Sequence, residues 1–268
     1  MRVHLYAQCL DDERMLPYFF RNYDGLVDRY VIFDDGSTDR SLSILHDHPR
    51  VEVRSFDRSV AESFVLSEQA LSNECWKESR GQADWVIVTD IDEHLHHPHI
   101  REYLSSMSAQ GTTLIPALGF QMISESTPEP EDNLSETITR GAPWEQMMKA
   151  SIFDPDGIAE IAFTLGRHKA EPTGIVRVPD TDEMVLLHYK YVSLEQTHAR
   201  HQQLKRGLRS VDIQNGWGHK YSWSLDQLKA DWDAIAAASV DIASMRDSVS
   251  DRYPFDRWWE KYRMGTSP

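Results

Sequence analysis

Two acidic clusters, each directly after an apolar run of strand length, constrain the fold of this chain most. RYVIF at 29–33 precedes DDGSTD at 34–39, and WVIVT at 85–89 precedes DIDE at 90–93. Helical patterns separate the apolar runs, and strands that alternate with helices predict a parallel, doubly wound sheet. Ligands of such sheets bind beyond the carboxyl ends of the strands. We therefore expect both clusters at the ligand-binding edge.

The remaining patterns extend this α/β interpretation along the chain. Strands are expected at 3–8, 29–33, 51–56, 85–89, 112–122, 158–163 and 184–189, and helices at 11–24, 42–45, 59–80, 193–208 and 225–238. They predict one domain at 1–192 and a helical C-terminal extension at 193–268 packed on it. The Pro- and acid-rich stretch 124–136 is expected to be a loop, either a lid or a disordered excursion.

The charge balance excludes one class of partner. The 268 residues include 28 Lys plus Arg against 43 Asp plus Glu, which gives a net charge of −15. A protein that holds nucleic acid by a general basic surface has the opposite balance. An anionic ligand remains compatible with this charge, because a bound metal ion supplies positive charge locally.

The cysteine content and the N-terminus indicate the compartment. Cys9 and Cys75 are too few for a disulfide framework. MRVHLYAQCL lacks the basic and then apolar regions of a signal peptide, and no window approaches the roughly 18 apolar residues of a membrane span. These features predict a cytoplasmic protein, and peripheral association with the inner face of a membrane stays open.

The first cluster has two interpretations. Gly36 allows a turn, and Ser37, Thr38 or Asp39 could cap the following helix, so the cluster could be a capped strand-to-helix turn alone. The adjacent carboxylates of Asp34 and Asp35 exceed what capping needs and could instead hydrogen-bond a nucleobase or a ribose.

The second cluster suggests a divalent cation. Side chains two apart in an extended stretch point the same way, so Asp90 and Asp92 should share one side. Their mutual repulsion is relieved by a cation bound beside them. The alternative is a solvated acidic strand end without a ligand.

Together, VIFDDGSTD and WVIVTDIDE resemble a family 2 glycosyltransferase with the GT-A nucleotide-sugar fold. The resemblance covers roughly residues 1–192 and includes the later LLHYKY. It implies an α/β, mostly parallel sheet, a nucleotide-diphosphate sugar donor, and Mn²⁺ or Mg²⁺ as cofactor.

The same resemblance assigns roles to individual acids. Asp34 and Asp35 would hold the nucleoside, with Gln8 at the end of the first strand in the same donor site. Asp90 would approach the ribose and also be a metal ligand, and Asp92 would bind the metal ion on the diphosphate.

Two residues at the end of the strand expected at 184–189 complete the predicted donor site. His188 is the candidate third metal ligand, which would favour Mn²⁺ over Mg²⁺. A core histidine hydrogen-bonded at a strand end is the alternative. Lys190 could meet a phosphate, although a surface lysine that extends into solvent is the commoner case.

The sequence leaves the general base open. Glu171 and His168 are candidates, and Glu125 is a third. The stretch 217–223, WGHKYSW, could stack an acceptor sugar or pack as an aromatic segment. The histidines of 94–99 suggest zinc when taken alone, but no spacing completes a tetrahedral set, which favours a polar loop.

These features predict a metal-dependent glycosyltransferase that moves a sugar, from a UDP-sugar as the first expectation, to a hydroxyl of a glycan or glycolipid. One rival is a sugar nucleotidyltransferase, which usually has a glycine-rich basic loop after its first strand. Here that loop, residues 8–13, is acidic and lacks glycine. The other rival is a non-catalytic protein of the same fold that binds sugar or metal.

Overall fold

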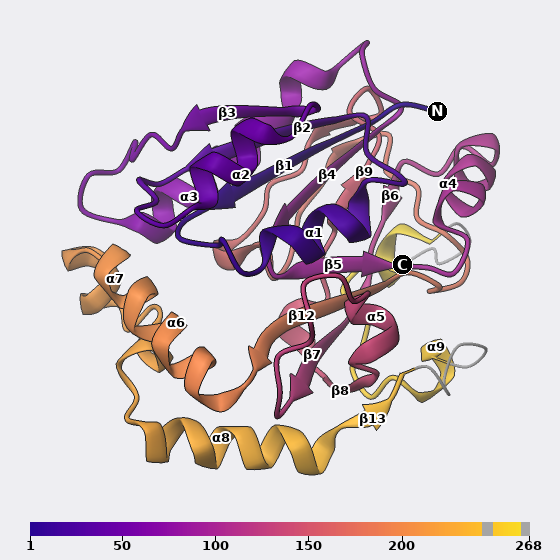
Figure 1. Ribbon diagram of the computed structural model, residues 1–268. Helices are drawn as coiled ribbons and strands as arrows, with labels where there is room; N and C mark the ends of the chain where they lie inside the picture. Colours follow the sequence, from indigo (N-terminus) through magenta and orange to yellow (C-terminus); the bar gives the residue numbers. More distant parts are fainter. Residues whose placement is uncertain (243–248, 264–268) are drawn as a thin grey trace.

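The computed structural model describes residues 1–242 and 249–263, which form two large β-sheets and a two-stranded one, with helices around them (Figure 1). The first sheet has the order β3-β2-β1-β4-β9-β6. β3, β2, β1 and β4 are parallel, and β9 is antiparallel to both β4 and β6. Its strands are β1 (Val3–Cys9), β2 (Arg29–Asp34), β3 (Val51–Ser55), β4 (Trp85–Asp90), β6 (Leu114–Ile115) and β9 (Ile152–Phe153).

The second sheet starts two residues after the first sheet's strand β4 ends. β4 ends at Asp90 and β5 begins at Glu93, so the connection between these two strands of different sheets consists of Ile91 and Asp92 alone. The sheet has the order β13-β8-β7-β12-β5, and within it only β7 and β12 pair in parallel. Its strands are β5 (Glu93–His96), β7 (Leu118–Ser124), β8 (Arg140–Pro143), β12 (Val185–Val192) and β13 (Val240–Asp241). The D-x-D segment therefore forms the corner between the two sheets.

Helices cover both sheets. The α-helices are α1 (Leu16–Tyr23), α2 (Ser41–Asp47), α3 (Phe64–Glu74), α4 (Ile100–Ala109), α5 (Leu134–Thr137), α6 (Leu194–Gly207), α7 (Ser210–Gln214), α8 (Leu225–Ala238) and α9 (Val249–Arg252). Short 3₁₀ turns are η1 (Cys75–Ser79), η2 (Glu145–Met147), η3 (Leu165–Arg167), η4 (His219–Ser222) and η6 (Glu260–Tyr262), and β10 (Ile158–Glu160) pairs with β11 (Thr173–Gly174). No helix in the described residues is long and apolar enough to cross a membrane.

Both faces of the first sheet are buried. Along β4, Trp85 and Ile87 belong to one hydrophobic cluster, and Val86 and Val88 belong to the other. This alternation follows the period of two of a strand. It confirms the predicted α/β fold with a largely parallel, doubly wound sheet.

The C-terminal third of the chain is helical and then returns to the core. Figure 1 shows α6, α7 and α8 on the side of the molecule where β12 ends. α8 packs through Leu228 and Trp232 against Ile123 and Tyr191 of the second sheet. Beyond α9, Trp259 is fully buried in the main core. Of the expected extension 193–268, residues 243–248 and 264–268 lie outside the described part.

Two predicted elements differ from the structure at their boundaries. The helix expected at 59–80 begins at Phe64, where the Ser63 side chain caps it, and changes to a 3₁₀ turn at Cys75. The strand expected at 112–122 is divided into β6 and β7. Pro116 separates the two pieces, and a proline has no N–H with which to continue a ladder.

The first residues of the helix expected at 11–24, which are acidic, form a bend and a turn instead. α1 begins only at Leu16, because the backbone at Asp11 has a φ of 51° and the Asp12 carboxylate accepts from the Leu10 N–H at 3.0 Å. The loop expected at 124–136 ends in α5. It is attached to α1, since the Tyr18 hydroxyl donates to the Pro128 carbonyl at 2.5 Å.

Candidate active site

A cleft of about 770 Å³ opens beside the corner between the two sheets. One end is formed by the D-x-D corner, the end of β12 and the segment from β8 to η3. The other end is formed by α8 and the loop before it. Its polar and aromatic lining comprises Asp90, Asp92, Glu93, Gln121, Trp144, Gln146, Lys149, His168, His188, Lys190, Tyr191, His201, Trp217, His219, Lys220, Tyr221 and Asp231. Both the expected domain and its helical extension therefore contribute to the cleft.

The two acids of D-x-D line this cleft, and Ile91 between them is buried in the core. Their partners differ. Asp90 Oδ2 lies 2.8 Å from a terminal nitrogen of Arg167. Asp92 Oδ2 lies 3.5 Å from His188 Nε2. The structure thus brings Asp92 and His188 together and directs Asp90 toward an arginine.

The environment of Asp92 favours its charged form. Burial alone would raise the pKa of Asp92, but His188 lowers it well below its usual value, and Lys190 and Arg200 add to this effect. On its other side, His188 Nδ1 lies 2.7 Å from Gln121 Oε1. The imidazole is therefore held between an amide and a carboxylate.

A buried group of charges supports the corner from behind. Glu93 is 1% exposed, and its carboxylate pairs with Lys149 at 2.5 Å and Arg167 at 2.9 Å. Burial would raise the pKa of Glu93, but the two cations hold it below its usual value. Because Arg167 also contacts Asp90, this group connects the first acid of D-x-D to the segment at 149.

Asp92 and His188 fit a divalent cation. Ligand oxygen and nitrogen atoms at about 2.1 Å from one ion lie roughly 3–3.5 Å apart, which agrees with the 3.5 Å between Asp92 Oδ2 and His188 Nε2. Among the described residues, no group of three or more His, Cys, Asp or Glu side chains is arranged to hold a metal ion. The pair would therefore supply two ligands, and Asp90 is engaged by Arg167.

His168 is the base candidate that lies in the cleft. Its Nδ1 is 2.7 Å from the Gln146 carbonyl oxygen. A carbonyl only accepts, so Nδ1 carries the proton and Nε2 keeps a lone pair. Burial and the nearby Lys149 lower the pKa of His168 to about 4, so the ring is neutral at physiological pH.

The two glutamates lie elsewhere. Glu171 is exposed, pairs with Lys261 at 2.7 Å and does not line the cleft. Glu125 is exposed just after β7 and does not line it either. Among the three candidates, the structure thus places only His168 at the site.

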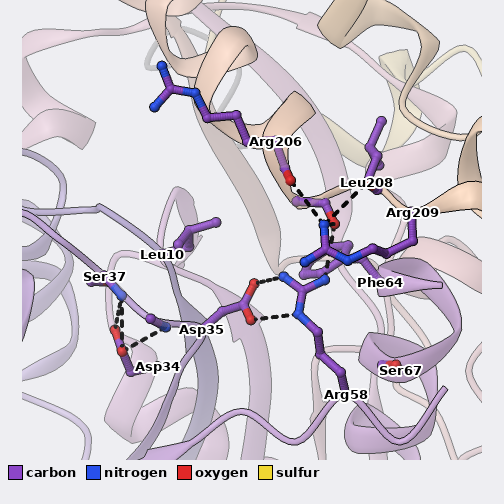
Figure 2. Close-up of polar contacts among 12 residues, drawn as sticks. Leu10, Asp34, Asp35, Ser37, Arg58, Phe64, Ser67, Arg206, Leu208 and Arg209 are labelled. Carbon is purple, nitrogen blue, oxygen red and sulfur yellow. Dashed lines mark hydrogen bonds and ion pairs between the residues drawn. The ribbon is translucent and has the colours of Figure 1, made fainter. Parts of the chain in front are cut away.

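Both acids at the end of β2 have protein partners (Figure 2). Asp34 accepts from the N–H groups of Gly36 at 2.9 Å and Ser37 at 3.1 Å, so it stabilises the turn. Asp35 pairs with Arg58 through both oxygens, at 2.5 and 3.0 Å. Arg58 also donates to the Gly207 carbonyl at 3.0 Å and so connects Asp35 to the end of α6.

Gln8 lies near the D-x-D corner. It is the penultimate residue of β1 and pairs in register with Asp90 of β4. Its Nε2 is buried without a hydrogen-bond partner, and so is Nε of Arg167. Gln8, Asp90 and Arg167 line one small cavity of about 10 Å³, about the size of a single water molecule.

The far end of the cleft is aromatic and cationic, and Lys190 at the end of β12 connects it to the D-x-D corner. Lys190 donates to the Tyr221 hydroxyl at 3.2 Å. Burial would lower the pKa of Lys190, but Tyr221 and Asp92 raise it, so the charged form is favoured. Trp217 lines the same end, and Lys220 pairs there with Asp231 at 3.0 Å.

The predicted site omitted several residues that line the cleft or contact its acids. Lys149 and Gln121 line the cleft, whereas Arg167 and Arg58 contact Asp90 and Asp35 without lining it. In the sequence each of the four is a single polar residue in an ordinary context, which carried no signal. For the histidine run, the structure shows a strand instead of a polar loop: His94 and His96 belong to β5.

Comparisons with known proteins identify one family. The model of glycosyltransferase family 92 matches residues 27–228, which is more than half of the chain. No curated protein sequence matches significantly.

Similar solved structures include S. aureus TarS 1-349 in complex with UDP, at 13% identity and a TM-score of 0.42, over 87% of this chain and 70% of that chain. Another is glucosyl-3-phosphoglycerate synthase from Mycobacterium tuberculosis in complex with Mn²⁺, UDP and glucosyl-3-phosphoglycerate. It shows 19% identity and a TM-score of 0.30, over 45% of this chain and 44% of that chain. The chain thus spans less than half the length of this synthase.

Proposed function

The chain belongs to glycosyltransferase family 92, and on this premise we propose that it transfers a sugar from a nucleotide-diphosphate sugar, a UDP-sugar, to a hydroxyl of a glycan or glycolipid. The transfer would invert the anomeric carbon. The expected glycosyltransferase activity is that of the family, whereas the family 2 assignment is not confirmed. The identities of the donor, the acceptor and the metal are what we propose here.

The observation that carries the proposal is the Asp92–His188 pair at the corner of a cleft wide enough for a nucleotide sugar. These two residues would hold Mn²⁺ or Mg²⁺. A divalent ion at this place supplies positive charge to the departing diphosphate. Lys190, charged and 3.2 Å from Tyr221, would add a second positive group for the same phosphates.

The nucleoside would lie toward the ends of β1 and β2. Gln8 would belong to this site at the end of β1, and Asp90, its register partner on β4, would approach the ribose. Asp35 would hydrogen-bond the base or ribose while Arg58 holds its carboxylate in place. Asp34 would act through the turn that it stabilises.

His168 would remove the proton from the acceptor hydroxyl. Its Nε2 lone pair is free because the Gln146 carbonyl holds the proton on Nδ1. The hydroxyl oxygen would then attack the anomeric carbon as the nucleoside diphosphate departs. The acceptor would enter over the helical part, where Trp217 offers a face for stacking. We place the catalytic unit at 1–192 and the acceptor-facing extension at 193–268.

Calorimetry of UDP with and without Mn²⁺, followed by hydrolysis assays over a library of nucleotide sugars, tests the proposal. Metal-dependent UDP binding and hydrolysis of one UDP-sugar are expected. A nucleotidyltransferase would instead release pyrophosphate from UTP and a sugar phosphate. Binding without turnover of any donor would identify a non-catalytic protein and contradict the proposal.

A further inference from the structure

Gln121 has a side chain whose hydrogen bonds determine the state of a neighbouring histidine. It lies in β7, is 2% exposed, and pairs in register with His188 of β12. Its Nε2 donates to the backbone carbonyls of His188 and Met122, both at 3.0 Å. Carbonyls only accept, so the amide nitrogen must face them. The amide oxygen is thereby directed toward His188 Nδ1, at 2.7 Å.

This orientation assigns the imidazole proton. An amide oxygen accepts, so His188 Nδ1 must donate to it and carry the proton. A neutral imidazole has one N–H, which leaves a lone pair on Nε2. That lone pair faces Asp92 Oδ2 at 3.5 Å. Two lone pairs that face each other are unfavourable unless a positive charge lies between them. That charge is either the Nε2 proton of an imidazolium, the form that lowers the pKa of Asp92, or a cation that takes the place of this proton.

The same pattern is found around protein-bound metal ions. A histidine ligand usually donates its other ring N–H to an acceptor, which sets the tautomer and the orientation of the ring. Here Gln121 supplies that acceptor, and backbone carbonyls of two neighbouring strands hold its amide in one orientation.

We propose that Gln121 is a positioning residue for a divalent cation: it holds His188 in the Nδ1–H tautomer, so that Nε2 and the Asp92 carboxylate face the ion together. The inference rests on the proposed function, because it assumes the metal that Asp92 and His188 would hold. It adds a residue on a different strand, 67 positions away in the sequence, that does not itself contact the ion.

The decisive variant is Gln121→Met, which keeps the length of the side chain and removes its acceptor. Mn²⁺ alone is the probe, and its dissociation constant is measured by electron paramagnetic resonance of the free ion. We expect binding to weaken roughly ten- to a hundredfold, as for other partners of metal-binding histidines. Gln69→Met is the matched control: Gln69 also donates to a backbone carbonyl, of Phe163 at 2.8 Å, but it lies in α3 and does not line the cleft.

A second measurement needs no change at position 121. Nitrogen-15 NMR of the metal-free wild-type protein at pH 8.5 reports which ring nitrogen of His188 carries the proton, with His188→Gln used to assign the signal. The proton is expected on Nδ1. A proton on Nε2 overturns the inference, and it does so even if Gln121→Met fails to fold.

The outcomes separate this inference from the function on which it rests. If the wild type binds Mn²⁺ and Gln121→Met binds it equally well, the inference is wrong and the proposed function stands. If the wild type binds no Mn²⁺, with or without UDP, both are wrong. Weaker binding in Gln121→Met with unchanged binding in Gln69→Met supports both.

Discussion

Three acidic side chains at the D-x-D corner of the cleft face three basic ones. Asp90 faces Arg167, Asp92 faces His188, and Glu93 faces Lys149. Removing one member of a buried pair leaves its partner uncompensated, which costs more than removing both. Substitutions that keep the shape of the side chain therefore distinguish chemistry from folding better than alanine does.

Asp92→Asn should remove metal-dependent nucleotide binding and turnover while the fold remains. The amide keeps the size of the carboxylate but lacks the charge that a divalent ion requires. UDP calorimetry with and without Mn²⁺ measures the effect, and circular dichroism controls for folding. Wild-type turnover in this variant, or in the presence of excess chelator, would contradict the metal mechanism.

The low pKa of His168 predicts that activity declines only at an unusually low pH. Its pKa is lowered to about 4 by burial and by Lys149. A general base must be unprotonated, so activity that depends on His168 should persist as pH falls from 7 to 5 and decline only near pH 4. The pH profile of kcat/KM measures this limit. The pH profile of UDP binding without metal, measured alongside it, shows whether nucleotide binding is lost over the same range.

His168→Ala should then lower kcat by roughly a hundredfold or more, with little change in UDP affinity. Glu171→Gln is the control, because Glu171 is exposed and paired with Lys261 outside the cleft. Should Glu171→Gln lose activity and His168→Ala keep it, the assignment of the base would be reversed.

At the scale of elements, sequence patterns located most strands and helices but not their partners. α8 agrees with its prediction residue for residue, since Ser224 and Gln227 form a capping box at its start. β6 and β7 could not be assigned to different sheets, because a strand pattern does not specify which strands pair with it. The same limit applies to the site: Glu93 and Lys149 are 56 positions apart, and Gln121 and His188 are 67 apart.

The start of α3 depends on a residue from a distant helix. Asp212 of α7 is fully buried and accepts from the Phe64 N–H at 2.9 Å, the Val65 N–H at 3.3 Å and the Ser63 hydroxyl at 2.5 Å. These N–H groups at the start of a helix have no partner within it. The bonds join the helical extension to the domain that carries the D-x-D corner.

Asp212→Ala should lower the free energy of unfolding by roughly 2–4 kcal/mol, since it leaves several buried donors without an acceptor. Urea denaturation measures the change. Asp226→Ala is the control: Asp226 is also in the first turn of a helix but is exposed, so a change within about 0.5 kcal/mol is expected. Equal effects of the two substitutions would show that the buried contacts of Asp212 contribute nothing specific.

Across the whole molecule, buried histidines occur in the first sheet, in the second sheet and in the helical extension. His4 lies in β1 of the first sheet, His94 in β5 of the second, and His201 in α6. Burial lowers the pKa of all three, to about 4 for His94 and about 3 for His201. In the unfolded chain a histidine titrates near 6.5. Below that pH the unfolded state binds protons that the folded state does not, so each of these residues destabilises the fold as pH falls from about 6.5 toward 4.

His94 allows this effect to be measured on one residue. Its ring is 2% exposed and lies 5.0 Å from the Tyr189 ring and 6.0 Å from the Tyr23 ring, so His94→Phe keeps an aromatic ring in an aromatic setting. Carboxyl groups with raised pKa values, such as Asp12, act in the opposite direction over part of the same range. The difference between wild type and variant removes their contribution. Between pH 7 and pH 5, the wild type should lose about 2 kcal/mol of unfolding free energy relative to His94→Phe.

Urea denaturation at both pH values provides the measurement. A stability difference for His94→Phe that is the same at pH 7 and pH 5 would mean that His94 is protonated in the folded chain. Its imidazole would then have to reach water or an acid, although in this structure Nε2 is buried and has no partner. The pH dependence therefore tests the packing of β5, whose first residue, Glu93, directly follows the D-x-D corner.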